Sequence, residues 1–186
     1  TDFTRAYTEF AARGPGSSFP DNPESHVRIV ADGTSGAIEL DGAVTNRVAT
    51  LQQANADIPA TVNTASKTLL TSSLAIAPGA AALTIGASVN SGALAALSAE
   101  GALSLANGSV NTQTVNASVA DNSAASIVNK SGSGPVVLNG TYSHTGPLVI
   151  SEGALVFGGH DVPQAVAGGI GGAGQPLRLA NKKPES

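Results

Sequence analysis

Short apolar runs that each end at a glycine or a polar turn residue are the feature that most limits what this chain can fold into. Between residues 131 and 157 these runs are Val136-Val137-Leu138, Leu148-Val149-Ile150 and Ala154-Leu155-Val156-Phe157. Runs of three or four residues are too short for helices, and turn residues at such close intervals are typical of strands joined by tight turns. The stretch therefore predicts β-structure, and we interpret the rest of the chain as the same architecture.

The kinds of apolar residue narrow the prediction further. The 186 residues include two Tyr, four Phe, no Trp and no Met, so Ala, Val, Leu and Ile must fill the interior. Small aliphatic side chains suit a thin core in which successive coils bury one another's apolar faces. The 22 glycines supply turns. The composition therefore favours an all-β fold of the β-solenoid type.

The distribution of charge divides the chain. Most charged residues precede Ile58, whereas residues 58–160 carry few. We predict an N-terminal arm and linker (1–25), a β-solenoid (26–160), and a Gly-rich linker with a C-terminal strand and tail (161–186). Within the solenoid, residues 27–42 are interpreted as a β-hairpin or a first coil. Residues 43–56 fit both helical and strand spacing, and we favour a strand because both flanks are strand-like.

The N-terminal arm holds four of the six aromatic residues, within its first 19 positions. Phe3, Tyr7 and Phe10 recur at i, i+4 and i+7, which predicts a short helix, with an extended arm as the alternative. The arm either covers the open end of its own solenoid or docks on the next subunit and joins copies into a filament. The last strand, around Leu177 to Ala180, either closes the chain's own sheet or adds to a neighbour's edge. The candidate subunit-docking residues are Phe3, Tyr7, Phe10, Phe19, Leu177 and Leu179.

Residues 130–157 also carry a recognisable motif. It consists of Lys130-Ser131-Gly132-Ser133-Gly134, a strand ending at Leu138, Gly140, Thr145-Gly146, a strand containing Val149, and Gly153-Ala154-Leu155. This order resembles the passenger-associated transport repeat, also called the autotransporter-associated β-strand repeat, of large bacterial surface proteins. His144 stands where that family usually has tyrosine, and Tyr142 lies two residues earlier. The motif residues are Gly132, Gly134, Leu138, Gly140, Gly146, Val149, Gly153 and Leu155.

The resemblance covers about one repeat strongly and residues 68–129 weakly. It implies a right-handed β-helix-like passenger segment that is exported and displayed outside a bacterium. In the family the repeat is associated with passenger export and folding rather than with an active site. We therefore expect an extracellular or cell-surface location.

The remaining residues offer little reactive chemistry. The formal net charge of −4 argues against a nucleic-acid partner, because such binding relies on Lys and Arg. Without cysteine, and with His26, His144 and His160 far apart, we predict no metal and no cofactor. His160 and Asp161 are adjacent and no Gly-x-Ser-x-Gly motif exists, so no catalytic triad is predicted. The uncharged stretch 68–99 is interrupted by Pro and Gly, so we predict no membrane insertion.

These observations favour a non-enzymatic structural protein. We expect a subunit or segment of an extracellular bacterial fibre or surface layer, whose partner is another copy of itself. The alternative is a surface adhesin whose outward Ser, Thr and Asn side chains bind glycans, although few aromatic residues are available to stack on sugars. A β-helix enzyme that degrades polysaccharide is least favoured, because residues 58–160 contain few carboxylates.

Overall fold

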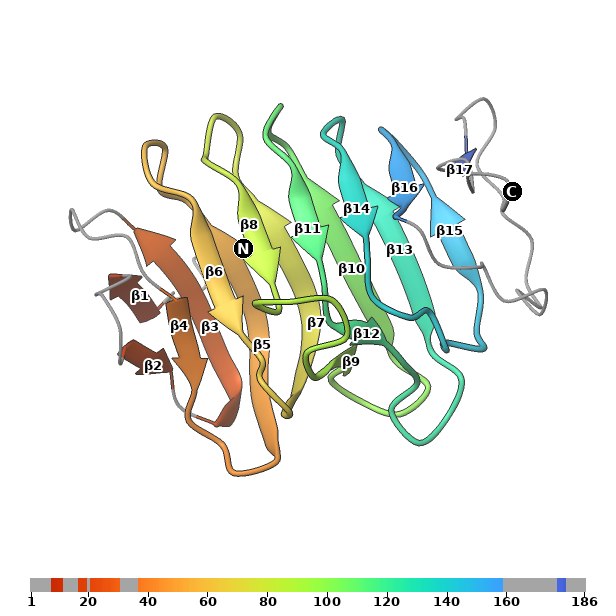
Figure 1. The fold of residues 1–186 in the computed structure, drawn as a ribbon, viewed down its shortest axis with the longest axis horizontal. Coiled ribbons are helices and arrows are strands. Elements are labelled where there is room, and N and C mark those ends of the chain that lie inside the picture. The colour runs from red at the N-terminus through yellow and green to blue at the C-terminus, as the bar shows by residue number, and fades with distance from the viewer. Residues whose placement is uncertain (1–7, 12–16, 20, 31–36, 159–176, 180–186) are drawn as a thin grey trace, which may run out of the picture.

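The computed structural model describes residues 8–11, 17–19, 21–30, 37–158 and 177–179. Within these residues the protein is all-β and contains no helix. Two sheets face each other, and their strands stack from the β1/β2 end of the molecule to the β15/β17 end (Figure 1). All the pairings between these strands are parallel, so the predicted β-solenoid is confirmed.

The first sheet, which we call sheet A, receives one strand from each coil and has two further strands beside its centre. Its main order is β1 (Thr8–Ala11), β3 (Asn22–Val30), β5 (Thr45–Gln53), β7 (Thr68–Ile76), β10 (Ala102–Asn107), β13 (Ile127–Ser131) and β15 (Leu148–Ile150). The additional strands are β9 (Ala93–Ala96), which pairs with β7, and β12 (Ser118–Val119), which pairs with β9.

The second sheet, sheet B, receives the other strand of each coil. Its order is β2 (Ser17–Phe19), β4 (Ala37–Leu40), β6 (Ala60–Asn63), β8 (Leu83–Ile85), β11 (Gln113–Val115), β14 (Val136–Leu138), β16 (Leu155–Phe157) and β17 (Leu177–Leu179). Each coil thus contributes a strand to sheet A and then a strand to sheet B, which is the path of a solenoid.

The core lies between the sheets and consists of rows of aliphatic side chains, one per coil. In sheet B the register aligns Ile38, Val62, Ile85, Val115 and Leu138, and every one of them is at most 1% exposed. Each side chain covers the same position of the coil before it. Because burial of one such side chain is worth about 1.5–3 kcal/mol, the stacked rows supply the main stabilising free energy.

The predicted N-terminal helix is wrong for the residues that the structure describes there. Thr8–Ala11 form β1, which pairs in parallel with Val27–Val30 of β3. An isolated amphipathic helix of about 13 residues is marginal in water, whereas the edge of β3 offers hydrogen bonds to every second residue of the arm. The extended alternative therefore describes this part of the arm. Strands β1 and β2 lie in the segment predicted as arm and linker, and β17 lies in the predicted C-terminal segment.

Two alternatives that the sequence left open, for residues 27–42 and 43–56, are resolved by the structure. Strands β3 and β4 belong to different sheets, so they are two sides of a coil and not a hairpin. The strand prediction for residues 43–56 is confirmed by β5. Its side chains alternate, with Asn46 and Val48 buried and Arg47 exposed.

The long strands β5 and β7 of sheet A share an irregular position, and in the coils that follow them a corner lies at the same place. In β5 and β7 the alternation of buried and outward side chains breaks at Ala49–Thr50 and Ser72–Ser73. Beyond β7 the strand is split: its first half pairs with β9 and its second half with β10. The turn between β9 and β10 occupies the break, and Glu100 there has a φ of 59°. Coils after β8 are therefore three-sided.

Candidate functional site

The five glycines of the repeat motif mark where neighbouring coils approach most closely. A Cβ atom added to any of them would lie under 3.0 Å from backbone of an earlier coil. The nearest atom is the carbonyl oxygen of Ser109 for Gly134, of Ala117 for Gly140 and of Ser126 for Gly146. For Gly132 it is that of Asn107 and for Gly153 that of Gly132, and both of these glycines also have positive φ. The motif therefore specifies the stacking of one coil on the next.

The three remaining motif residues lie on strands. Leu138 and Leu155 point into the core and are 1% and 0% exposed. Val149, at the centre of β15, is only partly buried and alternates with the buried Leu148 and Ile150, so its side chain lies on the outer face. These residues repeat the inside-outside pattern of a strand, and none of them forms a reactive group.

Lys130, the first residue of the motif, joins two coils from inside the protein. Its side chain is fully buried in the row between Leu105 and Ile150. The ammonium donates to the carbonyl oxygens of Ser131 (2.8 Å) and Gly132 (2.5 Å) in its own turn and of Glu152 (3.0 Å) in the next. Burial lowers the pKa of Lys130, partly offset by the Glu152 carboxylate. The lysine therefore fixes two successive turns to each other.

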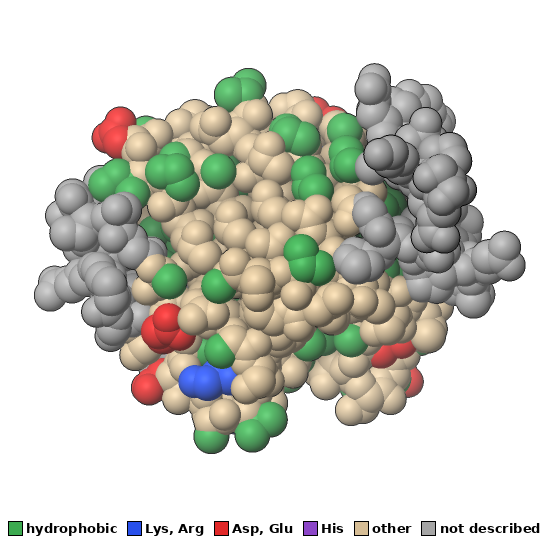
Figure 2. Space-filling model, in the orientation of Figure 1, with side chains coloured by type: hydrophobic (Ala, Val, Ile, Leu, Met, Phe, Trp, Pro, Cys, Tyr) green, Lys and Arg blue, Asp and Glu red, His purple; other side chains and the backbone are tan. Residues whose placement is uncertain are grey.

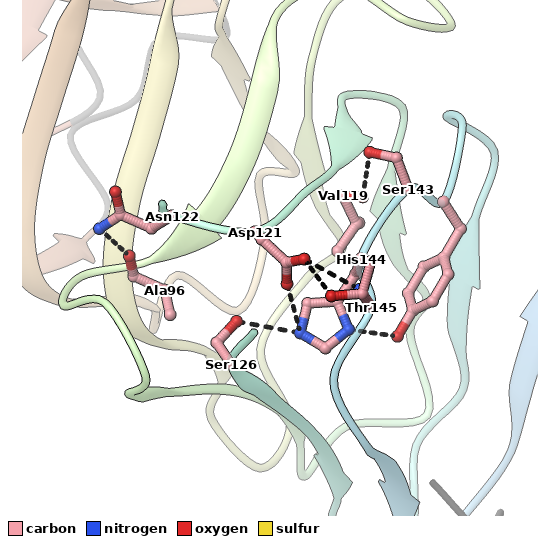
Figure 3. A network of polar contacts seen from close by, with 9 residues as sticks. Ala96, Val119, Asp121, Asn122, Ser126, Ser143, His144 and Thr145 are labelled. Atoms are coloured by element: carbon pink, nitrogen blue, oxygen red, sulfur yellow. Dashed lines mark hydrogen bonds and ion pairs between the residues drawn. The ribbon is translucent and has the colours of Figure 1, made fainter. Parts of the chain in front are cut away.

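The corner that follows the split of sheet A gathers a group of polar side chains. We call residues 120–126 and 143–147, which stack on each other, the polar corner. Asn122 donates to the carbonyl oxygens of Ala96 (3.0 Å) and Leu97 (3.2 Å), which connects the corner to β9. Thr145 donates to Asp121 Oδ2 through its backbone N–H (3.1 Å) and its hydroxyl (2.6 Å). Figure 3 shows Asp121, Ser126 and the ring of His144 converging at this place.

His144 lies at the centre of the polar corner and is 2% exposed. Its Nε2 is 2.9 Å from the hydroxyl of Ser126 and 3.5 Å from Asp121 Oδ1, and its Nδ1 is 3.1 Å from the hydroxyl of Tyr142. Tyr142 also packs edge-on against Phe157, with ring centroids 5.6 Å apart. The ring is therefore enclosed by hydroxyl groups, one carboxylate and an aromatic pair.

Burial and hydrogen bonds shift the pKa values of His144, Asp121 and Tyr142. Burial lowers the pKa of His144, and the Asp121 carboxylate only partly opposes it. Burial also raises the pKa of Asp121, but the hydrogen bonds from Thr145 and the nearby imidazole outweigh it, so the net direction is downward. The pKa of Tyr142 is raised, chiefly by burial. Near neutral pH the corner thus contains a neutral imidazole, an ionised carboxylate and a neutral phenol.

Although serine, histidine and aspartate meet here, their arrangement is not that of a catalytic triad. In a triad the serine and the carboxylate bind opposite nitrogens of the imidazole. Here Ser126 and Asp121 both approach Nε2, and Tyr142 occupies Nδ1. Ser126 is 1% exposed, so its hydroxyl is closed off from solvent. The geometry fits a structural network.

Four of the six candidate docking residues lie in described strands at the two ends of the solenoid. Phe10 is in β1 and Phe19 is in β2, which pair with β3 and β4 of the same chain. Leu177 and Leu179 are in β17, which pairs with β16. Phe3 and Tyr7 lie outside the described residues. The strands that hold Phe10, Phe19 and the two leucines thus extend the chain's own sheets by one strand each.

Sequence reasoning missed the polar corner and the interior role of Lys130. The signal that predicts the corner is period-2 alternation: Tyr142, His144, Gly146 and Leu148 are buried and the residues between them are exposed. That pattern assigns His144 to the interior, where a histidine needs partners. The sequence contains no comparable signal for Asp121 and Ser126, because they come from another coil.

Neither a metal site nor a membrane helix can be assigned to the described part of the chain. It contains no group of three or more His, Asp or Glu side chains placed to hold a metal ion. It also contains no helix that is long and apolar enough to cross a membrane.

Comparisons with protein-family profiles, curated proteins and solved structures found no match to this chain. The resemblance of residues 130–157 to the autotransporter-associated repeat therefore stays a prediction from the sequence.

Proposed function

We propose that this protein is a non-enzymatic structural segment of an extracellular bacterial fibre or surface layer, whose copies join end to end. The partner is a second copy of the chain, and the contact is an extension of the solenoid by its terminal strands. The resemblance of residues 130–157 to a repeat of exported surface proteins supports the location outside the cell.

One observation carries the proposal. Parallel pairing in both sheets continues without interruption to the outermost described strands, β1 and β15 in sheet A and β2 and β17 in sheet B. An edge strand has backbone N–H and C=O groups directed away from its own sheet, and these groups can pair with another chain. In a solenoid the same geometry that stacks coils within a chain can stack chains.

The outer faces of the solenoid suit a scaffold. On sheet B the register aligns Thr61, Thr84 and Thr114 in one outward row, and on sheet A it aligns Thr50, Ser73 and Ser104. Figure 2 shows a visible face made largely of uncharged polar side chains and backbone, with hydrophobic side chains scattered over it. Such a face remains hydrated, which leaves the ends as the places where copies join.

The test of assembly uses an edge variant with a matched control. Lysine on an edge strand opposes edge-to-edge pairing, so Val149→Lys on β15 should reduce assembly. Asn129→Lys is the control, because Asn129 is paired with Val149 in the same outer row but lies one strand inward. Wild-type protein should form filaments or concentration-dependent oligomers in negative-stain microscopy and mass photometry. Monodisperse monomers at every concentration would overturn the proposal.

The N-terminal arm is tested separately. Phe3→Ala combined with Tyr7→Ala should impair assembly and leave the β-rich circular dichroism spectrum unchanged, if these aromatic side chains dock between subunits. Loss of the β signal would instead assign them to the closure of the chain's own first coil.

A second candidate function is a glycan-binding adhesin. The rows of outward hydroxyl groups favour it, because they present repeated donors and acceptors. Against it, Tyr142 and Phe157 are both buried, and so neither can stack on a sugar. Binding of wild-type protein to a glycan array without self-assembly would favour this candidate over the fibre.

A further inference from the structure

The segment 143–147 is held to the preceding coil by contacts of the polar corner. Ser143 bonds to the carbonyl oxygen of Val119 through its backbone N–H (2.9 Å) and its hydroxyl (3.3 Å). Thr145 donates twice to Asp121, and His144 contacts Ser126. The segment leads directly into β15, which has only three residues paired with β13. The coil formed by β15 and β16, the last one with described strands in both sheets, therefore depends strongly on this corner.

A neutral His144 fits its surroundings in one tautomer. With hydrogen on Nε2, the ring donates toward Ser126 and Asp121, and Nδ1 accepts from the hydroxyl of Tyr142. Tyr142 is 2% exposed and stays protonated, so its hydroxyl hydrogen needs an acceptor inside the protein. In this arrangement Nδ1 is that acceptor.

We propose that the polar corner is a proton-operated latch, in which neutral His144 holds β15 and β16 on the preceding coil and protonated His144 releases them. A proton on Nδ1 turns that nitrogen from an acceptor into a donor. The hydroxyl hydrogen of Tyr142 must then turn away from the ring, although Nδ1 of His144 is the only hydrogen-bond partner of this hydroxyl among the described residues. A buried hydroxyl without an acceptor is costly, so the folded corner resists protonation.

Two titratable groups contact the ring. Asp121, from the preceding coil, favours the imidazolium, since its Oδ1 is buried, has no hydrogen-bond partner and lies 3.5 Å from Nε2. Tyr142, from the segment of His144 itself, opposes the imidazolium through its hydroxyl. Lys130, the nearest lysine in the sequence, directs its ammonium to turn carbonyls at a different corner. Burial outweighs the attraction of Asp121, and the net pKa of His144 is lowered.

The sign of the pH dependence follows from this direction. The pKa of His144 in the folded protein lies below the ordinary value of 6.5, so the opened state binds the proton more readily. Stability of the corner is complete above pH 6.5 and is lost as the pH falls through the lowered pKa. Asp121, whose pKa is also lowered from 3.8, loses its contribution only in stronger acid. The loss that comes from His144 therefore begins at a higher pH than the loss that comes from Asp121.

The latch also bears on assembly. Strand β15 is the edge that the proposed end-to-end contact would use, so acid would weaken that contact; this step alone rests on the proposed function. The latch itself is tested on the monomer, for instance on Val149→Lys protein, and its failure is distinguishable from failure to assemble.

The experiment is hydrogen exchange, corrected for intrinsic rates, at the amides of β15 between pH 7.5 and 5.0. Wild-type protection should fall by about tenfold for each pH unit by which the pKa of His144 lies below 6.5. His144→Gln keeps hydrogen-bonding groups but does not titrate, so its β15 protection should stay constant. His26→Gln is the control, because His26 lies in β3 at the other end and contacts Thr50.

Either of two results would overturn the proposal: constant protection of β15 in the wild type, or an equal loss in His144→Gln. If His144→Gln does not fold, an NMR titration of the His144 ring in the wild type decides. A pKa at or above 6.5 contradicts the latch, and a lower one supports it. In Asp121→Asn the ring pKa should fall further, because the carboxylate that favours the imidazolium is removed.

Discussion

The N-terminal and C-terminal coils of this solenoid are held together in different ways. In the N-terminal coils, β3, β5 and β7 have nine residues each, and the backbone ladder between them is long. In the C-terminal coils the strands of the same sheet, β13 and β15, have five and three residues. There the coils depend on Lys130, on the polar corner and on glycines that fit against the backbone of an earlier coil. Where the ladder shortens, specific side-chain contacts replace it.

The charges follow the same division. In the N-terminal coils the ion pair of Asp21 and Arg47 is solvent-exposed in part, with side-chain exposures of 25% and 48%. In the C-terminal coils the ammonium of Lys130 is buried and hydrogen-bonded. A buried charge without partners is far more costly than an exposed one. The comparison therefore predicts larger effects for substitutions in the C-terminal coils.

The largest effect is expected for Gly146→Ala. The added Cβ would collide with the carbonyl oxygen of Ser126, and backbone cannot move aside as a flexible side chain can. We expect a loss of about 3 kcal/mol in the free energy of unfolding, measured by chemical denaturation. Gly79→Ala is the control, since nothing lies within 4 Å of its Cβ position and only its φ of 75° opposes alanine; it should cost about 1 kcal/mol. Equal losses would contradict the role of close coil stacking.

Lys130 and Lys67 test the same comparison through the hydrogen bonds of their ammonium groups. Lys130→Met keeps the aliphatic stem between Leu105 and Ile150 but removes three charge-assisted hydrogen bonds. We expect a loss of about 2 kcal/mol, measured by urea unfolding. Lys67, whose ammonium donates to the carbonyl oxygen of Leu40, is the counterpart in the N-terminal coils. Lys67→Met should lower the free energy of unfolding by less. A larger loss for Lys67→Met than for Lys130→Met would contradict the greater dependence of the C-terminal coils on side-chain contacts.

The buried glutamine Gln113 offers a substitution that should stabilise the protein, and the equally buried Gln53 offers its control. Gln113 is fully buried between Leu83 and Val136, and its amide has no hydrogen-bond partner. Gln113→Leu should therefore raise the free energy of unfolding by about 1–2 kcal/mol. Gln53, equally buried, donates to the carbonyl oxygens of Ile58 (3.0 Å) and Ala82 (3.5 Å).

Gln53→Leu is the matched control for the unpartnered amide. It removes the donor from two carbonyl groups and should lower the free energy of unfolding by about 1 kcal/mol. Thermal unfolding monitored by circular dichroism measures both variants. If Gln53→Leu raised the free energy of unfolding, or Gln113→Leu lowered it, then hydrogen-bond partners would not decide how much these amides contribute to stability.

The solenoid could be predicted from the sequence because its signals are local. Runs such as Val136–Leu138, closed by turn residues, specify strands, and the absence of Trp and Met specifies a thin core. The motif glycines were found for the same reason, since Gly132 and Gly146 recur at fixed places in one repeat. Local signals also misled: the spacing of Phe3, Tyr7 and Phe10 matches a helix, but the edge of β3 recruits Thr8–Ala11 as a strand.

The polar corner could not be predicted, because its members come from different coils. Asp121 and Ser126 meet His144 only because one coil stacks on the next. No pattern in the sequence shows which residues of neighbouring coils come together. The phase break at Ser72–Ser73 in β7, two coils before the polar corner, is equally invisible, since neither serine is apolar and so neither marks a change of face. Contacts between coils depend on register, which the structure supplies and a single sequence does not.

The smallest effect is expected for the exposed ion pair of the N-terminal coils. Arg47 donates to both carboxylate oxygens of Asp21, through Nε at 2.9 Å and Nη2 at 2.5 Å, and joins β5 to the segment before β3. The hydrogen bond from Arg47 lowers the pKa of Asp21 below 3.8, although burial opposes it slightly. The pair therefore stabilises the protein at neutral pH, and this contribution is lost as the pH falls through the lowered pKa.

Asp21→Asn should thus produce only a small decrease in the midpoint of urea unfolding at low salt, and the decrease should vanish at high salt because exposed charges are screened. His144→Gln, at the buried end of the comparison, should give a shift that salt does not remove. If Asp21→Asn were as destabilising as His144→Gln at high salt, the N-terminal coils would depend on a single side-chain contact in the way that the C-terminal coils do. The long ladders of β3, β5 and β7 would then not be the source of their stability.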